Sequence, residues 1–252
     1  MTDARGVVTP GLHNMKVTAD LETTLGPQEH KDFRSIVGKL MWLSPLRPDM
    51  TYCIKEMARA VTSPTMEHLV RLKHLLRYLS GTKHFKFKVR PDYMFSTGAK
   101  VPGDFMVYVD SDWAGCKTTR RSTSGGVLKF LGQALLSWSR TQSSVATSSA
   151  EAELYAICSG TSGGLYPINL TNELTSFFSN PSLTVHTDSS AGKSMAAREG
   201  TSKKTKHIDI RHFWLRSLIT NGLLRLSKVS GIDNFSDILT KAVDRATLER
   251  HR

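Results

Sequence analysis

Hydrophobic residues in the first third of the chain recur every three or four positions, which is the spacing of one helix face. This pattern predicts three helices, which begin near residues 28, 49 and 66. Pro45 and Pro48 end the first helix, because proline cannot continue one. We therefore expect a smaller, mainly helical subdomain in this part of the chain.

From residue 104 onward, short apolar runs bounded by turn residues replace the helical spacing. They predict strands at residues 105–109, 126–131 and 134–138, with a hairpin turn between the last two. A helix should follow after residue 148, and then a strand at 183–186. Two helices come next, one after residue 188 and one at 208–220. A strand at 223–229 and a final helix at 234–243 complete the order. This order predicts an α/β fold with a mixed sheet.

These patterns divide the chain into four predicted regions. Residues 1–26 show little apolar periodicity and are expected to form a flexible lead-in. Residues 27–100 form the helical subdomain, residues 104–243 form the α/β domain, and residues 244–252 form a C-terminal tail.

The formal net charge of +12 favours a polyanionic partner. The three cysteines, Cys53, Cys116 and Cys158, have no paired spacing, so we expect free thiols in a reducing compartment. No charged-then-apolar leader opens the chain, and no apolar run reaches the length of a membrane span. An intracellular protein without a membrane partner is expected.

Four acidic residues stand at the edges of predicted elements: Asp110, Glu153, Asp188 and Asp237. Carboxylates from such distant segments can hold hard divalent cations, because Mg²⁺ prefers oxygen ligands. A pair of these ions can activate water and stabilise the leaving oxygen of a phosphodiester. The four acids therefore predict a nuclease.

Glu151 competes with Glu153 for the role of ligand. Two residues apart on a helix, the side chains point roughly 200° away from each other, so they should not share one site. Ser148 and Glu151 have the spacing of a capping box, which would turn Glu151 back onto its own helix start. This leaves Glu153 as the preferred ligand.

The other acids also have competing interpretations. Asp112 shares a strand face with Asp110, so spacing does not separate them. Asp188 could cap the helix that follows it, and Asp233 competes with Asp237 as a cap.

Five blocks contain or adjoin these acids. They read YVDSDWAGCKTTRRSTSG from residue 108, WSRTQSSVATSSAEAELYA from 138, TDSSAGKSMA from 187, KTKHIDIRHFWLR from 204 and FSDILTKAV from 235. In this order they resemble the ribonuclease H domain of copia-type retrotransposon Pol polyproteins. The run FRSIVGKLMWLSPLRPDMTYCIKEMAR, from residue 33, is similar to the segment that joins the polymerase to that domain.

The resemblance implies a ribonuclease H-like fold, with a mixed five-stranded sheet and flanking helices, that hydrolyses the RNA strand of RNA–DNA hybrids. It selects Asp110, Glu153, Asp188 and Asp237 as catalytic residues and as ligands of two Mg²⁺ ions, for which Mn²⁺ can substitute. Residues 27–100 would be a thumb- or connection-like segment of the reverse transcriptase. The polymerase part of the same polyprotein is a candidate partner, and no small-molecule cofactor or polymerase activity is expected. Such a protein would work in a cytoplasmic retrotransposon particle or in the nucleus.

Two basic groups would hold the hybrid under the same resemblance. They are Lys117, Arg120 and Arg121, and then Lys203, Lys204, Lys206 and Arg211. His207 is interpreted as a packing residue, with phosphate binding left open. Trp113 and Trp138 are interpreted as core residues.

A second hypothesis is a decayed element that only binds nucleic acid. Gly160, Gly163, Gly164 and Pro167 should interrupt the helix that follows Glu153, because each interior glycine costs about 1 kcal/mol and proline about 3 kcal/mol. A shortened helix would still hold Glu153 near its start.

Overall fold

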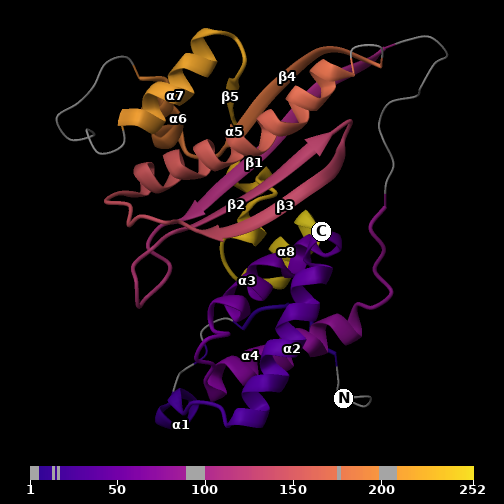
Figure 1. The fold of residues 1–252 in the computed structure, drawn as a ribbon, viewed down its shortest axis with the longest axis vertical. Coiled ribbons are helices and arrows are strands. Elements are labelled where there is room, and N and C mark those ends of the chain that lie inside the picture. Colours follow the sequence, from indigo (N-terminus) through magenta and orange to yellow (C-terminus); the bar gives the residue numbers. More distant parts are fainter. Residues whose placement is uncertain (1–5, 13–14, 16–17, 89–99, 175–176, 199–208) are drawn as a thin grey trace. The chain divides into compact units, whose positions relative to one another are not determined.

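The computed structural model describes residues 6–12, 15, 18–88, 100–174, 177–198 and 209–252 (Figure 1). The chain divides into two compact units. One unit joins residues 1–88 to residues 241–252, and the other holds residues 89–240. The first unit is therefore built from both ends of the chain.

The three helices predicted to begin near residues 28, 49 and 66 are confirmed. Within the described residues, helices make up the first unit. They are α1 (Ala19–Glu22), α2 (Pro27–Leu43), α3 (Thr51–Arg59), α4 (Met66–Gly81) and α8 (Arg245–His251), with the 3₁₀ turns η1 (Ser44–Leu46) and η2 (Pro48–Met50) between α2 and α3. Pro27 occupies the first turn of α2, where a missing N–H costs nothing. The apolar faces of α2, α3 and α4 supply the core, which includes Phe33, Val37, Leu40, Ile54, Met57, Leu72, Leu75 and Tyr78.

Both ends of the chain are more ordered than the pattern predicted. The expected lead-in contains α1, and Thr24 forms a bridge with Thr65. The expected C-terminal tail forms α8, whose N-cap Asp244 accepts a hydrogen bond from the N–H of Thr247 at 2.8 Å. Leu248 of α8 is fully buried. One buried side chain and one cap are enough to order a short helix that sequence periodicity alone does not reveal.

The second unit contains a five-stranded mixed sheet in the order β3-β2-β1-β4-β5. Its strands are β1 (Val101–Asp112), β2 (Thr123–Phe130), β3 (Gln133–Thr141), β4 (Phe178–Thr187) and β5 (Arg225–Lys228). β2 is antiparallel to β1 and β3, whereas β4 is parallel to β1 and β5. The predicted hairpin turns at Leu131 and Gly132, both of which have positive φ. The expected mixed five-stranded α/β sheet is confirmed.

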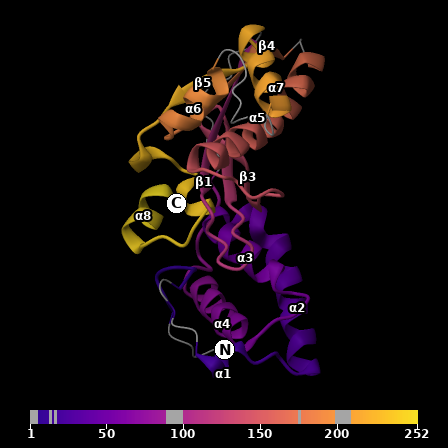
Figure 2. The same ribbon diagram turned by 90° about the vertical axis from the view of Figure 1, so that its left-hand side faces the viewer.

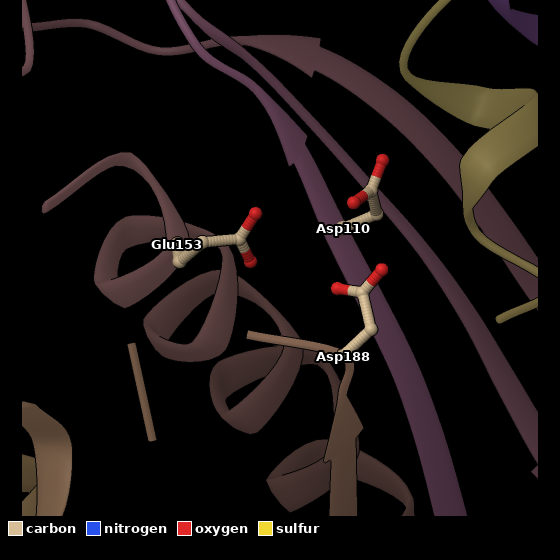
Figure 3. Close-up of side chains that lie close together, drawn as sticks. All are labelled: Asp110, Glu153 and Asp188. Atoms are coloured by element: carbon tan, nitrogen blue, oxygen red, sulfur yellow. The ribbon is translucent and has the colours of Figure 1, made fainter. Parts of the chain in front are cut away.

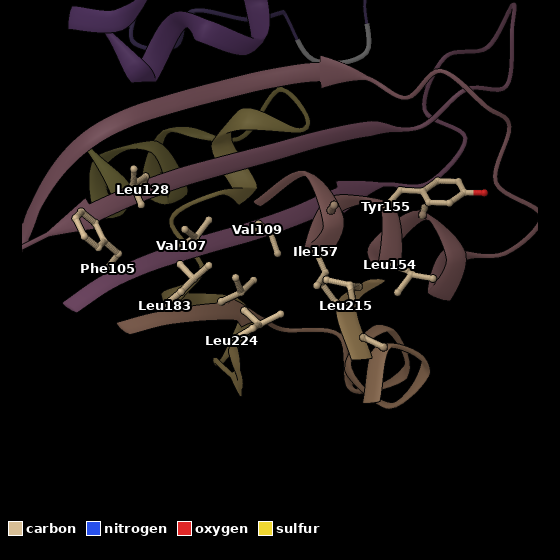
Figure 4. Close-up of a cluster of buried hydrophobic side chains, with 14 of the residues drawn as sticks. Phe105, Val107, Val109, Leu128, Leu154, Tyr155, Ile157, Leu183, Leu215 and Leu224 are labelled. Carbon is tan, nitrogen blue, oxygen red and sulfur yellow. The ribbon is translucent and has the colours of Figure 1, made fainter. Parts of the chain in front are cut away.

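Three helices flank the sheet: α5 (Ser149–Glu173), α6 (Ser190–Ala197) and α7 (Asp209–Thr220). Figure 1 shows α5 running along the strands, and in the turned view of Figure 2 it lies to one side of them. Alternate residues of β1, namely Phe105, Val107 and Val109, are buried in the same hydrophobic cluster as Leu154 and Ile157 of α5 (Figure 4). This packing fixes α5 against β1.

The prediction that α5 would be interrupted is wrong. The helix runs through Gly160 and Gly164, because both glycines lie against the sheet. A Cβ at Gly160 would come within 2.4 Å of Val109 Cγ1, and one at Gly164 within 2.5 Å of Leu183 Cδ1. The absence of side chains lets helix and strands approach closely, and the buried contacts outweigh the low helix propensity.

The predicted final helix over residues 234–243 is also wrong. This segment contains only the short 3₁₀ helix η5 (Asp237–Leu239), and η4 (Gly231–Asp233) precedes it. Asn234 and Thr240 explain the difference, because their buried side chains bond to β1. These bonds hold the segment in an irregular path across the end of the strand.

The two tryptophans expected in the core differ. Trp113 is 50% exposed, and its indole N–H donates to the backbone oxygen of Ala146 at 3.1 Å. It therefore ties two loops together instead of filling the core. Trp138 is half-buried against the core, over Gly126, where a Cβ would come within 2.1 Å of its ring.

Candidate metal centre

Three of the four predicted acids meet at one edge of the sheet. Asp110 lies near the end of β1, Asp188 directly follows β4, and Glu153 lies in the first turns of α5. Because β1 and β4 are parallel and pair Val109 with Thr187, the next residue of each chain segment emerges at the same edge. One carboxylate oxygen from each acid lies within 4.8 Å of the others, and Figure 3 shows the side chains converging.

Glu153 is held in place by donors from both strands. The backbone N–H and the hydroxyl of Ser111 donate to Oε1, at 3.3 and 2.8 Å, and the hydroxyl of Thr187 lies 3.5 Å from Oε2. The glutamate is only 8% exposed. Burial, followed by the charges of Asp110 and Asp188, raises the pKa of Glu153 to about 8 in spite of the Ser111 bonds. The site thus favours a bound positive charge, either a proton or a cation.

The residues fit a divalent cation. Three carboxylate oxygens at short range form a hard donor set of the kind that Mg²⁺ and Mn²⁺ prefer. Glu153 is buried and faces two further acids, so a cation would relieve both the desolvation and the repulsion.

Glu151 has the structural role that its spacing predicts. Its backbone N–H donates to the hydroxyl of Ser148, the N-cap of α5, at 3.2 Å. Its carboxylate turns back onto the loop before the helix and accepts from the N–H and hydroxyl of Thr147, at 2.7 and 2.6 Å. Tyr155 also donates to it. Glu151 therefore holds the helix start, and Glu153 alone faces the other two acids.

The structure also separates the remaining pairs of candidates. Asp112 lies outside the group of three, and its carboxylate covers Gly115 in the following turn, where a Cβ would come within 1.8 Å of Oδ2. Asp188 is not the cap of α6, because Ser189 is the N-cap and accepts from the N–H of Gly192 at 3.0 Å. Asp188 instead belongs to the group of three carboxylates.

Asp237 is not part of the group of three carboxylates. It begins η5, and its backbone oxygen lies 3.1 Å from the hydroxyl of Thr240. That hydroxyl donates to Asp110. Asp237 is thus linked to the site through Thr240, and its role as a fourth ligand stays a prediction. Asp233, its competitor, lies exposed in η4.

The predicted nucleic-acid-binding residues divide into three sets. Lys117, Arg120 and Arg121 lie exposed in the connection between β1 and β2. Arg211 lies in the first turn of α7 and covers the ring of Tyr155, with its guanidinium carbon 4.3 Å from the ring centroid. The rest, Lys203, Lys204 and Lys206, fall outside the described residues, and so does His207, the predicted packing residue.

Sequence reasoning missed a pocket beside Arg211. The pocket has a volume of about 340 Å³, and two arginines, Arg140 and Arg211, line it together with hydroxyl side chains that include Thr141, Ser143 and Ser144. Gln142 is 8% exposed, and its Oε1 finds no hydrogen-bond partner among the described residues. The run RTQSS at the end of β3 holds most of these residues, so the signal was present in the sequence as a cation followed by polar side chains.

The strand order, with parallel β1 and β4 ending at an acidic group, defines a ribonuclease H-like domain. The chain is 31% identical, over 250 residues, to the "Retrovirus-related Pol polyprotein from transposon RE1" of Arabidopsis thaliana, and 29% identical over 256 residues to that from transposon TNT 1-94 of Nicotiana tabacum. Each match covers 99% of this chain. The chain belongs to the retrovirus-related Pol polyproteins of copia-type transposons.

The chain spans only 16% and 18% of the length of these two relatives. Among solved structures, the N-terminal ribonuclease H domain of a Mycobacterium tuberculosis protein matches with a TM-score of 0.41 and 10% identity, over 59% of this chain and 95% of that one. No family model matches the chain. Within the described residues, every helix is too short or too polar to cross a lipid bilayer.

Proposed function

We propose that this chain hydrolyses the RNA strand of RNA–DNA hybrids, as the ribonuclease H part of a retrotransposon reverse transcriptase. The observation that carries the proposal is the convergence of Asp110, Glu153 and Asp188 at one edge of the sheet. The family to which the chain belongs supports the same activity.

The three acids would hold divalent cations, Mg²⁺ or Mn²⁺. Such cations, when bound, supply an activated water and charge stabilisation for the departing oxygen of a phosphodiester. The protein fixes the acids in advance: β1 and β4 set the spacing of Asp110 and Asp188, and Ser111 orients Glu153. The three carboxylates then need little rearrangement when the cations and the substrate bind.

The basic residues of the sheet unit would hold the hybrid. Arg140 and Arg211 line one pocket together with hydroxyl side chains, and this lining suits a backbone phosphate. The exposed Lys117, Arg120 and Arg121 would add phosphate contacts. Lys203, Lys204 and Lys206 remain predicted contacts, and the polymerase part of the polyprotein remains a proposed partner.

Cleavage of an end-labelled RNA–DNA hybrid with Mg²⁺ or Mn²⁺ tests the proposal. Asp188→Asn removes one charge of the acidic group, and Asp104→Asn is the matched control. Asp104 is an exposed acid of β1 that accepts from Ser182, on the same sheet but outside the group.

We expect the wild type and Asp104→Asn to cut only the RNA strand, and Asp188→Asn to lose at least about 100-fold of the activity, because metal-held charge is worth several kcal/mol in such reactions. Duplex DNA and duplex RNA should stay intact. A folded wild type that leaves the hybrid whole with both ions, or an Asp188→Asn protein as active as wild type, would overturn the proposal.

The rival hypothesis of a binding module without catalysis rested on an interrupted helix after Glu153. Because α5 is continuous and its glycines pack against the sheet, that observation no longer favours it.

A further inference from the structure

Residues 234–240 lie against the end of β1, and two buried side chains anchor them. Asn234 is fully buried, and its Nδ2 donates to the backbone oxygen of Val109 at 3.0 Å. Its Oδ1 accepts from the N–H and the hydroxyl of Ser236, at 3.3 and 2.6 Å. Asn234 therefore fixes the start of the segment beside the residue that precedes Asp110.

Thr240 anchors the other end of this segment to Asp110 itself. It is fully buried, and its hydroxyl donates to Oδ2 of Asp110. The same hydroxyl oxygen lies 3.1 Å from the backbone oxygen of Asp237. One side chain thus joins the acidic group to the segment that carries the fourth predicted acid.

Gly125 makes this contact sterically feasible. It pairs with Asp110 across β1 and β2. A Cβ at this position would come within 2.8 Å of both Thr240 Cγ2 and Leu239 Cβ, and within 3.0 Å of the backbone oxygen of Ser236. The turn therefore lies directly on the strand pair beside the acid, and a hydroxyl at position 240 meets the carboxylate without an intervening side chain.

We propose that Thr240 is a positioning residue, whose hydroxyl orients the Asp110 carboxylate for divalent cations. The inference rests on the proposed function and deepens it. The terminal torsion of an aspartate is broad and carries little preference of its own, so a donor fixed by the fold decides which way the oxygens point. Partners that orient metal ligands in this way typically change metal affinity 10–100-fold when removed.

Titration of the metal-free protein with Mn²⁺ tests the inference without relying on activity. Electron paramagnetic resonance measures the binding, because the signal of the free ion is lost when the ion binds. Thr240→Val removes the hydroxyl at constant shape, and Thr240→Ser restores it. Thr161→Val is the matched control: Thr161 is also fully buried, but its hydroxyl donates to the backbone oxygen of Ile157 within α5.

We expect Thr240→Val to bind Mn²⁺ on the order of 10-fold more weakly than wild type or worse, and Thr240→Ser to recover most of that affinity. Thr161→Val should bind as wild type does, even where its melting temperature falls as far as that of Thr240→Val.

Equal Mn²⁺ affinity in wild type and Thr240→Val would overturn the inference and leave the proposed function standing. An equal loss in Thr161→Val would also overturn it, because general destabilisation would then explain the effect. A wild type that binds no Mn²⁺ would overturn the metal site and, with it, both proposals.

Discussion

Both units of the protein bury acids, and one from each, Asp49 and Glu153, lie in opposite surroundings. In the helical unit, Asp49 is 6% exposed and receives two hydrogen bonds from the guanidinium of Arg47, at 2.9 and 2.7 Å, and one from Tyr78 at 2.7 Å. In the sheet unit, Glu153 is 8% exposed, but its donors are the neutral groups of Ser111 and Thr187, and its neighbours are two more acids.

The difference separates a structural acid from a functional one. Arg47 compensates the charge of Asp49 within the fold, so Asp49 needs no cation from solution. Asp49 also accepts from Tyr78, and this bond holds η2 against α4. Glu153 lies where burial and neighbouring charge raise its pKa to about 8. Buried carboxyls in such surroundings are frequent at functional sites, because the missing positive charge is left for a ligand.

The largest expected effect comes from breaking the buried ion pair of Arg47 and Asp49. Arg47→Met leaves Asp49 buried without its guanidinium, and we expect the free energy of unfolding to fall by about 3–5 kcal/mol. Urea unfolding measures this loss. Arg59→Met is the control, since Arg59 pairs with Glu56 on the surface, and it should change stability by less than about 1 kcal/mol.

A loss of similar size in both arginine variants would contradict the interpretation of Asp49 as a buried, compensated acid. The double variant Arg47→Met with Asp49→Leu sharpens the test, because it removes both charges together. It should recover much of the stability, since an apolar pair can replace a buried ion pair without a large loss.

A second prediction is that close packing of α5 against the sheet, and not the acidic group, stabilises the sheet unit. Gly160→Ala forces a Cβ against Val109, and overpacking of this kind costs about 1–3 kcal/mol. Gly163→Ala is the matched variant on the same helix, because its Cβ would meet only the ring of Trp138, at 3.5 Å. It should gain up to ~1 kcal/mol from the better helix propensity of alanine.

Thermal unfolding of the two glycine variants measures the change in stability that each alanine causes. Opposite shifts in melting temperature are expected. Equal gains in both would mean that Gly160 is not needed for close packing, and the continuity of α5 through its glycines would then lack its explanation.

The smallest expected effect concerns metal and stability. Mg²⁺ at ten times its dissociation constant should stabilise the wild type by ~1.4 kcal/mol, and a chelator should remove the gain. Asp188→Asn should lose this response, while its metal-free form stays at least as stable as wild type because one repulsive charge near Glu153 is gone. Calorimetry with and without Mg²⁺ measures both quantities.

A stabilising response to Mg²⁺ that persists in Asp188→Asn would place the ion elsewhere. The helical unit supplies an internal reference, because its buried Asp49 is already paired with Arg47. Arg47→Met should lower stability without changing the response to Mg²⁺.

Local patterns predicted much of this structure. Alternation and helical spacing located the five strands and most helices, and the capping-box spacing of Ser148 and Glu151 left Glu153 as the acid that faces the site. These features depend on neighbours in sequence. Asp110 and Asp112 could not be separated in this way, since both lie on one face of the strand, and the turn at Gly115 distinguishes them.

The failures share a physical cause, which is contact between distant segments. From the sequence alone, Gly160 and Gly164 are expected to break the helix. In the structure they allow it to pack closely against the sheet. Residues 234–243 have a helical pattern, but Asn234 and Thr240 bond to β1 instead. Arg140 and Arg211 are 71 positions apart in sequence and meet only in the folded pocket.

The proposed site for divalent cations consists of Asp110, Glu153 and Asp188. Anomalous diffraction from crystals of the protein soaked in Mn²⁺ tests it most directly, with crystals of Asp188→Asn beside them. We expect an anomalous peak between the three carboxylates in the wild type that weakens or vanishes in the variant. A wild type with all three carboxylates in place and no peak between them would contradict it.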